Sequence, residues 1–293
     1  MNQPTAPDTR SGAPSLTYAP TGRLAPWAPR LLGVFALVQM ALMVAVCLPV
    51  WLGVMSSDVL NAITPLVMWS PALVLVVLHL LFRRPVSLPR WAALGVRPAG
   101  RTFAVLGLLL VVMLLIPALT IAVAVPLGLV DLAPTGGAAT TALFVLPMIL
   151  VMMLTTLGEE TAWRGYVQST LAPLGFWRSS LTIAAYWALW HLPVATSYWL
   201  DGQMAGREVV VTSVNLLLSA IVLSAVRYLS GSVWPAVAGH AMLNSVLVFA
   251  YSNLVTPTSA LSDGAYWAYA LVTWAVWSLA IGFMVRLVAR RAV

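Results

Sequence analysis

The sequence predicts an all-α membrane protein, a polytopic bundle of about eight transmembrane helices. Of the 293 residues, 61% are hydrophobic and only 8% are charged, and the mean hydropathy is +0.95. Long apolar runs recur along the whole chain, which a soluble globular domain would not tolerate. Helices and closed barrels are the only structures that span a bilayer, and these runs have the length of helical spans.

The elements follow in order from the N-terminus. Residues 1–29 are rich in Pro, Thr, Ala, Ser and Gly and lack the pattern of a cleaved signal peptide, so we expect a disordered cytoplasmic tail. Residues 30–293 are predicted to form the membrane bundle. Its first run, 31–53, is long enough to cross a hydrocarbon core of about 30 Å. The other predicted spans cover about 64–82, 104–128, 141–157, 179–199, 208–229, 234–252 and 266–287.

Arginine is distributed as the positive-inside rule requires. The chain has 15 basic residues, all of them Arg. Fourteen fall in the tail or in alternate segments at the ends of predicted spans, and the opposite loops carry acids and only Arg207. We therefore expect a multi-pass protein of the cell membrane, in a bacterial plasma membrane, with both termini cytoplasmic. Because topology accounts for the net charge of +7, no nucleic-acid partner is expected.

Two adjacent glutamates, Glu159 and Glu160, follow the apolar run 141–157. An acid inside the membrane costs about 2.5 to 3.5 kcal/mol on insertion scales, so two of them require a reason. On a helix, Glu160 and Arg164 share a face as an i,i+4 pair, whereas Glu159 points about 100° away and is free for other work. The alternative reading is a charged helix end at the membrane interface.

Three further polar residues lie inside predicted spans. His191 is followed two positions later by Pro193, which predicts that the helix kinks or ends beside the histidine. His240 and Asn244 are spaced i,i+4, so an imidazole and an amide are expected to converge and to suit an oxyanion. Hydrogen bonds between helices are the structural alternative for all three.

Taken together, three short motifs carry a resemblance to a known family. The first motif is two Glu, three residues and Arg; the second is Phe, three residues and His; the third is His, three residues and Asn. The matching residues are Glu159, Glu160 and Arg164, then Trp187 in place of Phe with His191, then His240 and Asn244. Over about residues 141–250 the chain resembles the CAAX-protease and bacteriocin-processing family of intramembrane peptidases, which is related to the Ras-converting CAAX endopeptidase.

The resemblance implies an endopeptidase that hydrolyses a peptide bond in a membrane-associated protein or peptide within the lipid bilayer. Glu159 would act as the general base that activates a water, with help from His191. His240 and Asn244 would stabilise the oxyanion, and Glu160 with Arg164 would hold the helix end.

A metal is the main open question of this mechanism. Glu159, His191 and His240 also form a credible zinc set of two imidazoles and a carboxylate. The chain lacks the His-Glu-x-x-His spacing that places ligands and base on one helix, so we favour catalysis without a cofactor.

Two other functions fit a bundle with buried acids and histidines. A transporter or proton relay predicts a polar path that reaches Asp131 or Asp201 on the far side. A non-catalytic membrane adaptor or bacteriocin-immunity protein would keep the fold without the activity.

Overall fold

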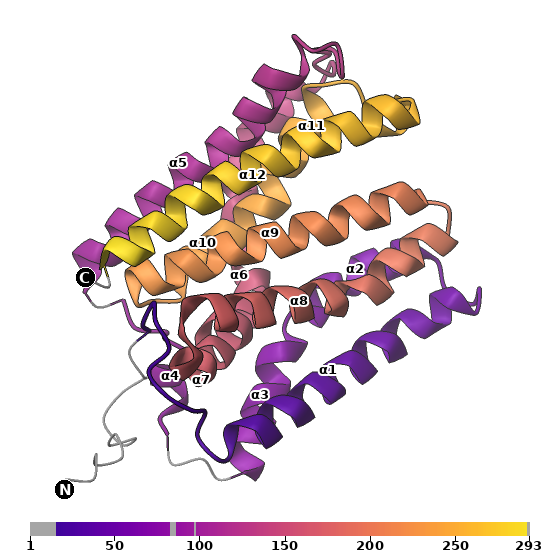
Figure 1. Ribbon diagram of the computed structural model, residues 1–293. Coiled ribbons are helices and arrows are strands. Elements are labelled where there is room, and N and C mark those ends of the chain that lie inside the picture. Colours follow the sequence, from indigo (N-terminus) through magenta and orange to yellow (C-terminus); the bar gives the residue numbers. More distant parts are fainter. Residues whose placement is uncertain (1–15, 83–85, 97, 292–293) are drawn as a thin grey trace, which may run out of the picture.

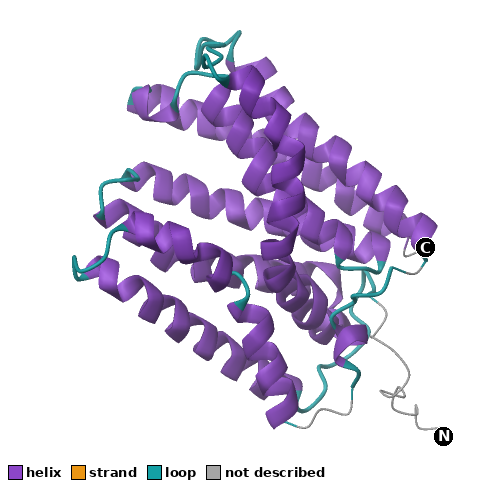
Figure 2. Ribbon diagram, turned by 180° about the vertical axis from the view of Figure 1, so that it is seen from behind, coloured by secondary structure: helices purple, strands orange, loops and turns teal. Residues whose placement is uncertain are grey.

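The computed structural model describes residues 16–82, 86–96 and 98–291, which form helices joined by short loops (Figures 1 and 2). No β-strand occurs in these ranges; Leu132 and Val255 form an isolated bridge. The all-α prediction is therefore confirmed. In order along the first half, the helices are α1 (Ala28–Trp51), α2 (Ser57–Val67), α3 (Ser70–Leu81), α4 (Leu88–Trp91) and α5 (Ala99–Ala124).

The second half contains two π-helical segments, η1 and η3, within otherwise α-helical stretches. A π segment widens the helix locally and is frequent at functional sites. The order is α6 (Ala138–Glu160), η1 (Thr161–Val167), α7 (Gln168–Leu171), η2 (Ala172–Leu174), α8 (Gly175–Leu200), α9 (Gly206–Ser230), α10 (Trp234–Met242), η3 (Leu243–Leu247), α11 (Val248–Asn253), η4 (Thr258–Ala260) and α12 (Asp263–Arg291).

Judged by helix length and composition, the structure does not give the eight membrane spans expected from the sequence. Within the described ranges, five continuous helical stretches are long and apolar enough to cross a membrane. A sixth is added if α2 and α3, which meet at a bend of 44°, count as one span. One of the five stretches, Ala138–Leu200, contains both α6 and α8, and the predicted span 234–252 is divided among α10, η3 and α11. The count of eight is therefore not confirmed.

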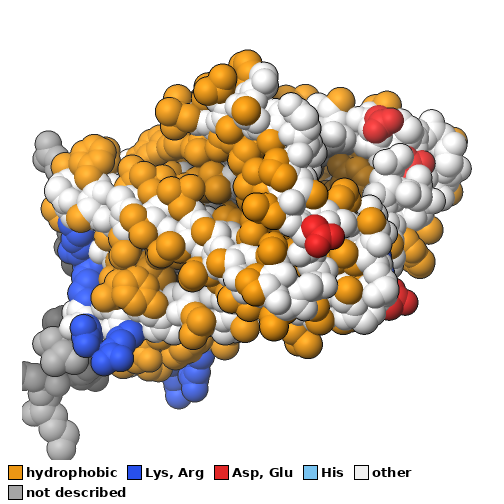
Figure 3. All heavy atoms as spheres, turned by 90° about the horizontal axis from the view of Figure 1, so that it is seen from above, with side chains coloured by type: hydrophobic (Ala, Val, Ile, Leu, Met, Phe, Trp, Pro, Cys, Tyr) orange, Lys and Arg blue, Asp and Glu red, His pale blue; other side chains and the backbone are white. Residues whose placement is uncertain are grey.

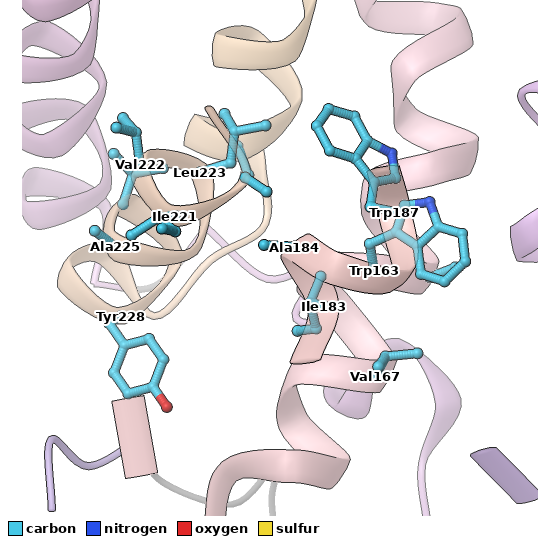
Figure 4. Packing of buried hydrophobic residues seen from close by; sticks show 14 of the residues in the cluster. Trp163, Val167, Ile183, Ala184, Trp187, Ile221, Val222, Leu223, Ala225 and Tyr228 are labelled. Atoms are coloured by element: carbon cyan, nitrogen blue, oxygen red, sulfur yellow. The ribbon is translucent and has the colours of Figure 1, made fainter. Parts of the chain in front are cut away.

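The long helices lie side by side in the order α1, α8, α9, α12 and α5 (Figure 1). The short helix α10 packs against α5, α6 and α9, so it lies inside the bundle. Residues of η1, α8 and α9 share one hydrophobic core, in which the Trp163 and Trp187 indoles lie together on one side (Figure 4). This arrangement surrounds the segments that carry the three motifs.

Both ends of the described chain lie at the same end of the bundle. The Tyr18 carbonyl accepts a hydrogen bond from the Phe176 amide at the start of α8, and Arg291 donates to the carbonyl of Tyr228 near the end of α9. The Ser179 and Tyr228 hydroxyls join these two helix ends at 2.9 Å. Exposed Arg side chains gather towards this end and the acids towards the other (Figure 3).

The expected tail differs from the structure in its second half. Residues 1–15 lie outside the described part of the chain. Residues 16–27, by contrast, pack on the bundle: the Tyr18 ring stacks on Phe176 at 6.1 Å, and the Thr21 amide donates to the Pro173 carbonyl. Residues 16–27 were thus wrongly assigned to a disordered tail, because their polar and Pro-rich composition does not reveal the docking of Tyr18.

Two glycines allow close backbone packing on either side of the first motif. A Cβ on Gly158 would lie 2.6 Å from the Met68 carbonyl oxygen, and one on Gly165 would lie 2.5 Å from the Ala92 carbonyl oxygen. Real Cβ atoms do not approach backbone atoms so closely. The segment between them is therefore clamped by the backbone that connects α2 to α3 and by the end of α4.

Candidate active site

The predicted pair of Glu160 and Arg164 is formed, and a third residue joins it. Arg164 Nη1 donates to Glu160 Oε1 at 2.8 Å, and both side chains are fully buried. The same oxygen lies 2.9 Å from His240 Nδ1, which comes from α10. A carboxylate only accepts, so the Nδ1 atom carries the proton in this contact. Glu160 therefore links the first motif to the third.

Glu159 has a different set of neighbours, as its position on the helix predicts. Its Oε2 accepts a hydrogen bond from the indole nitrogen of Trp187 on α8 at 2.8 Å. Both residues are buried. The two glutamates thus contact different helices: Glu159 binds α8 through Trp187, and Glu160 binds α10 through His240.

The orientation of His191 follows from a backbone contact. His191 Nδ1 lies 2.8 Å from the Trp187 carbonyl oxygen. Because a carbonyl only accepts, Nδ1 must donate, and the neutral ring then has its lone pair on Nε2. The imidazole is half-buried, with the Trp187 and Trp190 rings edge-on at 4.9 Å.

Of the expected kink or helix end beside His191, the end does not occur, because α8 continues through Pro193 to Leu200. The irregular backbone lies instead in η1, directly after Glu160, and in η3.

Asn244 differs from His240 in burial. His240 lies in the last turn of α10 and is buried, whereas Asn244 lies in η3 and is exposed. The helix changes from α to π between them. Asn244 makes no hydrogen bond with the part of the chain that the structure describes.

Comparison with known families agrees with the motif positions. Residues 141–246 match the family described as type II CAAX prenyl endopeptidase Rce1-like. This stretch is Rce1-like. It covers about a third of the chain and contains all three motifs. The resemblance inferred from the motifs is confirmed for this stretch, and it supports a peptidase of the CAAX-protease type. No curated protein matches the chain significantly.

Sequence reasoning missed one buried charge in the Rce1-like region. Arg227 was assigned to the cytoplasmic ends of the spans, but it is buried at the end of α9. Its Nε donates to the Arg164 carbonyl oxygen at 3.1 Å, and its Nη2 donates to Ser169 Oγ at 3.2 Å. Arg164 is buried as well, so these two arginines are not surface markers of topology. The signal was present, because Arg227 falls within the apolar run 208–229.

The zinc set suggested by the sequence does not fit the Rce1-like region. No three His, Cys, Asp or Glu side chains in the described ranges are placed to bind one metal ion. A metalloprotease site is therefore not supported within the described part of the chain.

Proposed function

We propose that the protein is an intramembrane endopeptidase that hydrolyses a peptide bond in a membrane-associated peptide or protein. The main observation behind this proposal is that Glu159, His191 and His240 all contact Trp187. These residues come from three separate helices, and their rings and the indole lie within contact distance. Interior carboxylates and imidazoles are costly in a membrane, and such a cluster favours chemistry over packing.

Each group has a proposed role in the hydrolysis. Glu159 is the general base that takes a proton from water, and the lone pair on His191 Nε2 helps to orient that water. His240 holds Glu160 through Nδ1 and donates to the oxyanion through Nε2, which requires the doubly protonated ring. Asn244 is exposed, and its side-chain amide donates a second hydrogen bond to the oxyanion. A single oxyanion donor was worth about 2.7 to 4 kcal/mol in a known protease.

The transporter alternative lacks its expected polar path. Asp131 and Asp201 are exposed in loops, and Asp201 accepts two hydrogen bonds from Ser57. The buried carboxylates within the described ranges are Glu159 and Glu160 alone. A peptidase accounts for this one-sided distribution more directly than a relay across the bundle.

The experiment is cleavage of a peptide with a C-terminal CaaX sequence and a farnesylated cysteine, the substrate class that the family's name indicates. Purified protein in lipid vesicles should cleave it, and Glu159→Gln should lower kcat by at least about a hundredfold. Glu208→Gln is the matched control because Glu208 only caps the start of α9, where it accepts from the Ala205 amide. Equal activity of Glu159→Gln and wild type would refute the proposal; cleavage of the unprenylated peptide alone would change only the substrate class.

We also propose that the reaction needs no metal. Elemental analysis of active protein should find less than stoichiometric zinc, and chelation should leave the rate unchanged. Stoichiometric zinc that is lost together with activity, and that restores activity when it is added back, would recast His191 and His240 as ligands.

A further inference from the structure

Trp187 occupies the centre of the site and makes a contact that phenylalanine could not make. The resembled family has Phe at this position, whereas this chain has an indole whose N–H donates to Glu159 Oε2 at 2.8 Å. The ring is fully buried on α8. Phenylalanine would supply a similar apolar wall but no donor.

The same residue touches nearly every ionisable group of the site. The Arg164 guanidinium lies over the ring at 4.4 Å from its centre, a favourable cation–π distance. The His240 ring meets it edge-on at 5.2 Å, and the Trp187 carbonyl accepts from His191 Nδ1 at 2.8 Å. A change in the indole orientation would therefore be felt by the base and by both histidines.

The hydrogen bond matters because a carboxylate is otherwise poorly fixed. Rotation about the terminal bond of a Glu side chain is broad and roughly two-fold, so packing alone does not aim its oxygens. The indole N–H holds Oε2, which leaves Oε1 of Glu159 without a partner among the described residues. Oε1 is then the atom available to a water.

We propose that Trp187 is a positioning residue for the peptidase reaction: its indole N–H holds one oxygen of Glu159 so that the other faces the attacking water. This inference rests on the proposed function. It assigns to Trp187 a role beyond filling space, and the two roles predict different results when only the N–H is removed.

Trp190 supplies the matched control. It is buried on the same helix, and its ring meets His191 edge-on at 4.9 Å, as the Trp187 ring does. Its indole nitrogen, however, has no hydrogen-bond partner within the described ranges. Trp190→Phe therefore removes the same atoms and the same ring area as Trp187→Phe, but no bond to the base.

The kinetic test compares the two variants on the farnesylated CaaX peptide. Trp187→Phe should lower kcat by about tenfold to a hundredfold with KM unchanged, because a hydrogen bond to a charged group is lost. The fall in kcat for Trp190→Phe should be at least about tenfold smaller. Thermal unfolding in detergent should show that both variants stay folded, with the larger loss of stability for Trp187→Phe, because only this variant leaves a buried carboxylate oxygen without its donor. Equal kcat values for the two variants, or a change confined to KM, would overturn the proposal.

A second measurement does not depend on activity. In protein labelled with ¹⁵N at the Trp indole nitrogens, the Trp187 signal is identified by its absence in Trp187→Phe. This signal should shift more than that of any other Trp in Glu159→Ala and should stay in place in Glu208→Ala. An unmoved signal in Glu159→Ala would show that the hydrogen bond does not exist. If the wild type cleaves no peptide, the proposed function and the kinetic role fail together, and a shifted signal would then leave Trp187 a purely structural partner of Glu159.

Discussion

Replacing Glu160 by glutamine should destabilise the protein more than the same change at Glu159. Glu160 Oε1 accepts from Arg164 at 2.8 Å and from His240 at 2.9 Å, and the Arg164 side chain is fully buried. Two further nitrogens of Arg164, Nε and Nη2, have no hydrogen-bond partner within the described ranges. Breaking a buried ion pair from one side costs about 3 to 5 kcal/mol. Because glutamine keeps one acceptor oxygen, we expect about 3 kcal/mol for Glu160→Gln.

Glu159→Gln should be milder, because the amide oxygen still accepts from Trp187. The expected loss is about 1 kcal/mol, the difference between a charged and a neutral hydrogen bond. The free energies of unfolding of both variants can be compared by denaturant titration in mixed micelles. Both variants should lose activity, but only Glu160→Gln should lose most of its folded population at moderate denaturant.

A double variant tests the cause of this difference. Glu160→Gln combined with Arg164→Met removes the unpaired charge and should be about 2 kcal/mol more stable than Glu160→Gln alone, while remaining inactive. A double variant less stable than the single one, or equal stability of Glu159→Gln and Glu160→Gln, would refute the division of labour between the two glutamates.

Three other predictions concern the fold. Reporter fusions at both termini should report the cytoplasm; a C-terminal fusion that reports the other side would mean that the number of spans is odd. Gly165→Ala should lower the free energy of unfolding by about 1 to 3 kcal/mol, because the new Cβ would meet the Ala92 carbonyl, whereas Gly282→Ala, with open space around it, should have little effect. The hydrogen bonds from the Ser57 hydroxyl and amide lower the pKa of Asp201 from its model-peptide value of 3.8. Their stabilising contribution should be full above that value and fall as the pH drops through the lower folded-state pKa; an unchanged acid limb in the unfolding profile of Asp201→Asn would contradict this.

The parts of the site that are local in sequence could be predicted, and the parts that depend on tertiary packing could not. The prediction of the Glu160–Arg164 ion pair was correct, because an i,i+4 contact requires only that the segment be helical. The His240 contact to Glu160 joins residues 80 positions apart, and the Trp187 contact to Glu159 joins residues 28 positions apart. Nothing in the spacing of these residues specifies such contacts.

The two π-helical segments also could not be predicted from the sequence. The segments η1 and η3 have only seven and five residues, and hydrophobic periodicity is read over a longer window, so it gives no sign of a change in helical pitch. Residues 141–246 were nevertheless recognisable, because the motif positions depend on residue identity and not on the turn between them.

The buried charges of the described chain have a consequence for membrane insertion. They are two carboxylates, Glu159 and Glu160, and two guanidiniums, Arg164 and Arg227, so with neutral imidazoles their sum is zero. Arg227 has no carboxylate of its own and binds only the Arg164 carbonyl and Ser169. Its positive charge nonetheless offsets the second glutamate, so the buried charges sum to zero until His240 takes up the second proton that the proposed mechanism requires. A chain that acquired the glutamate pair without a second interior arginine would carry one uncompensated negative charge through every step of its assembly.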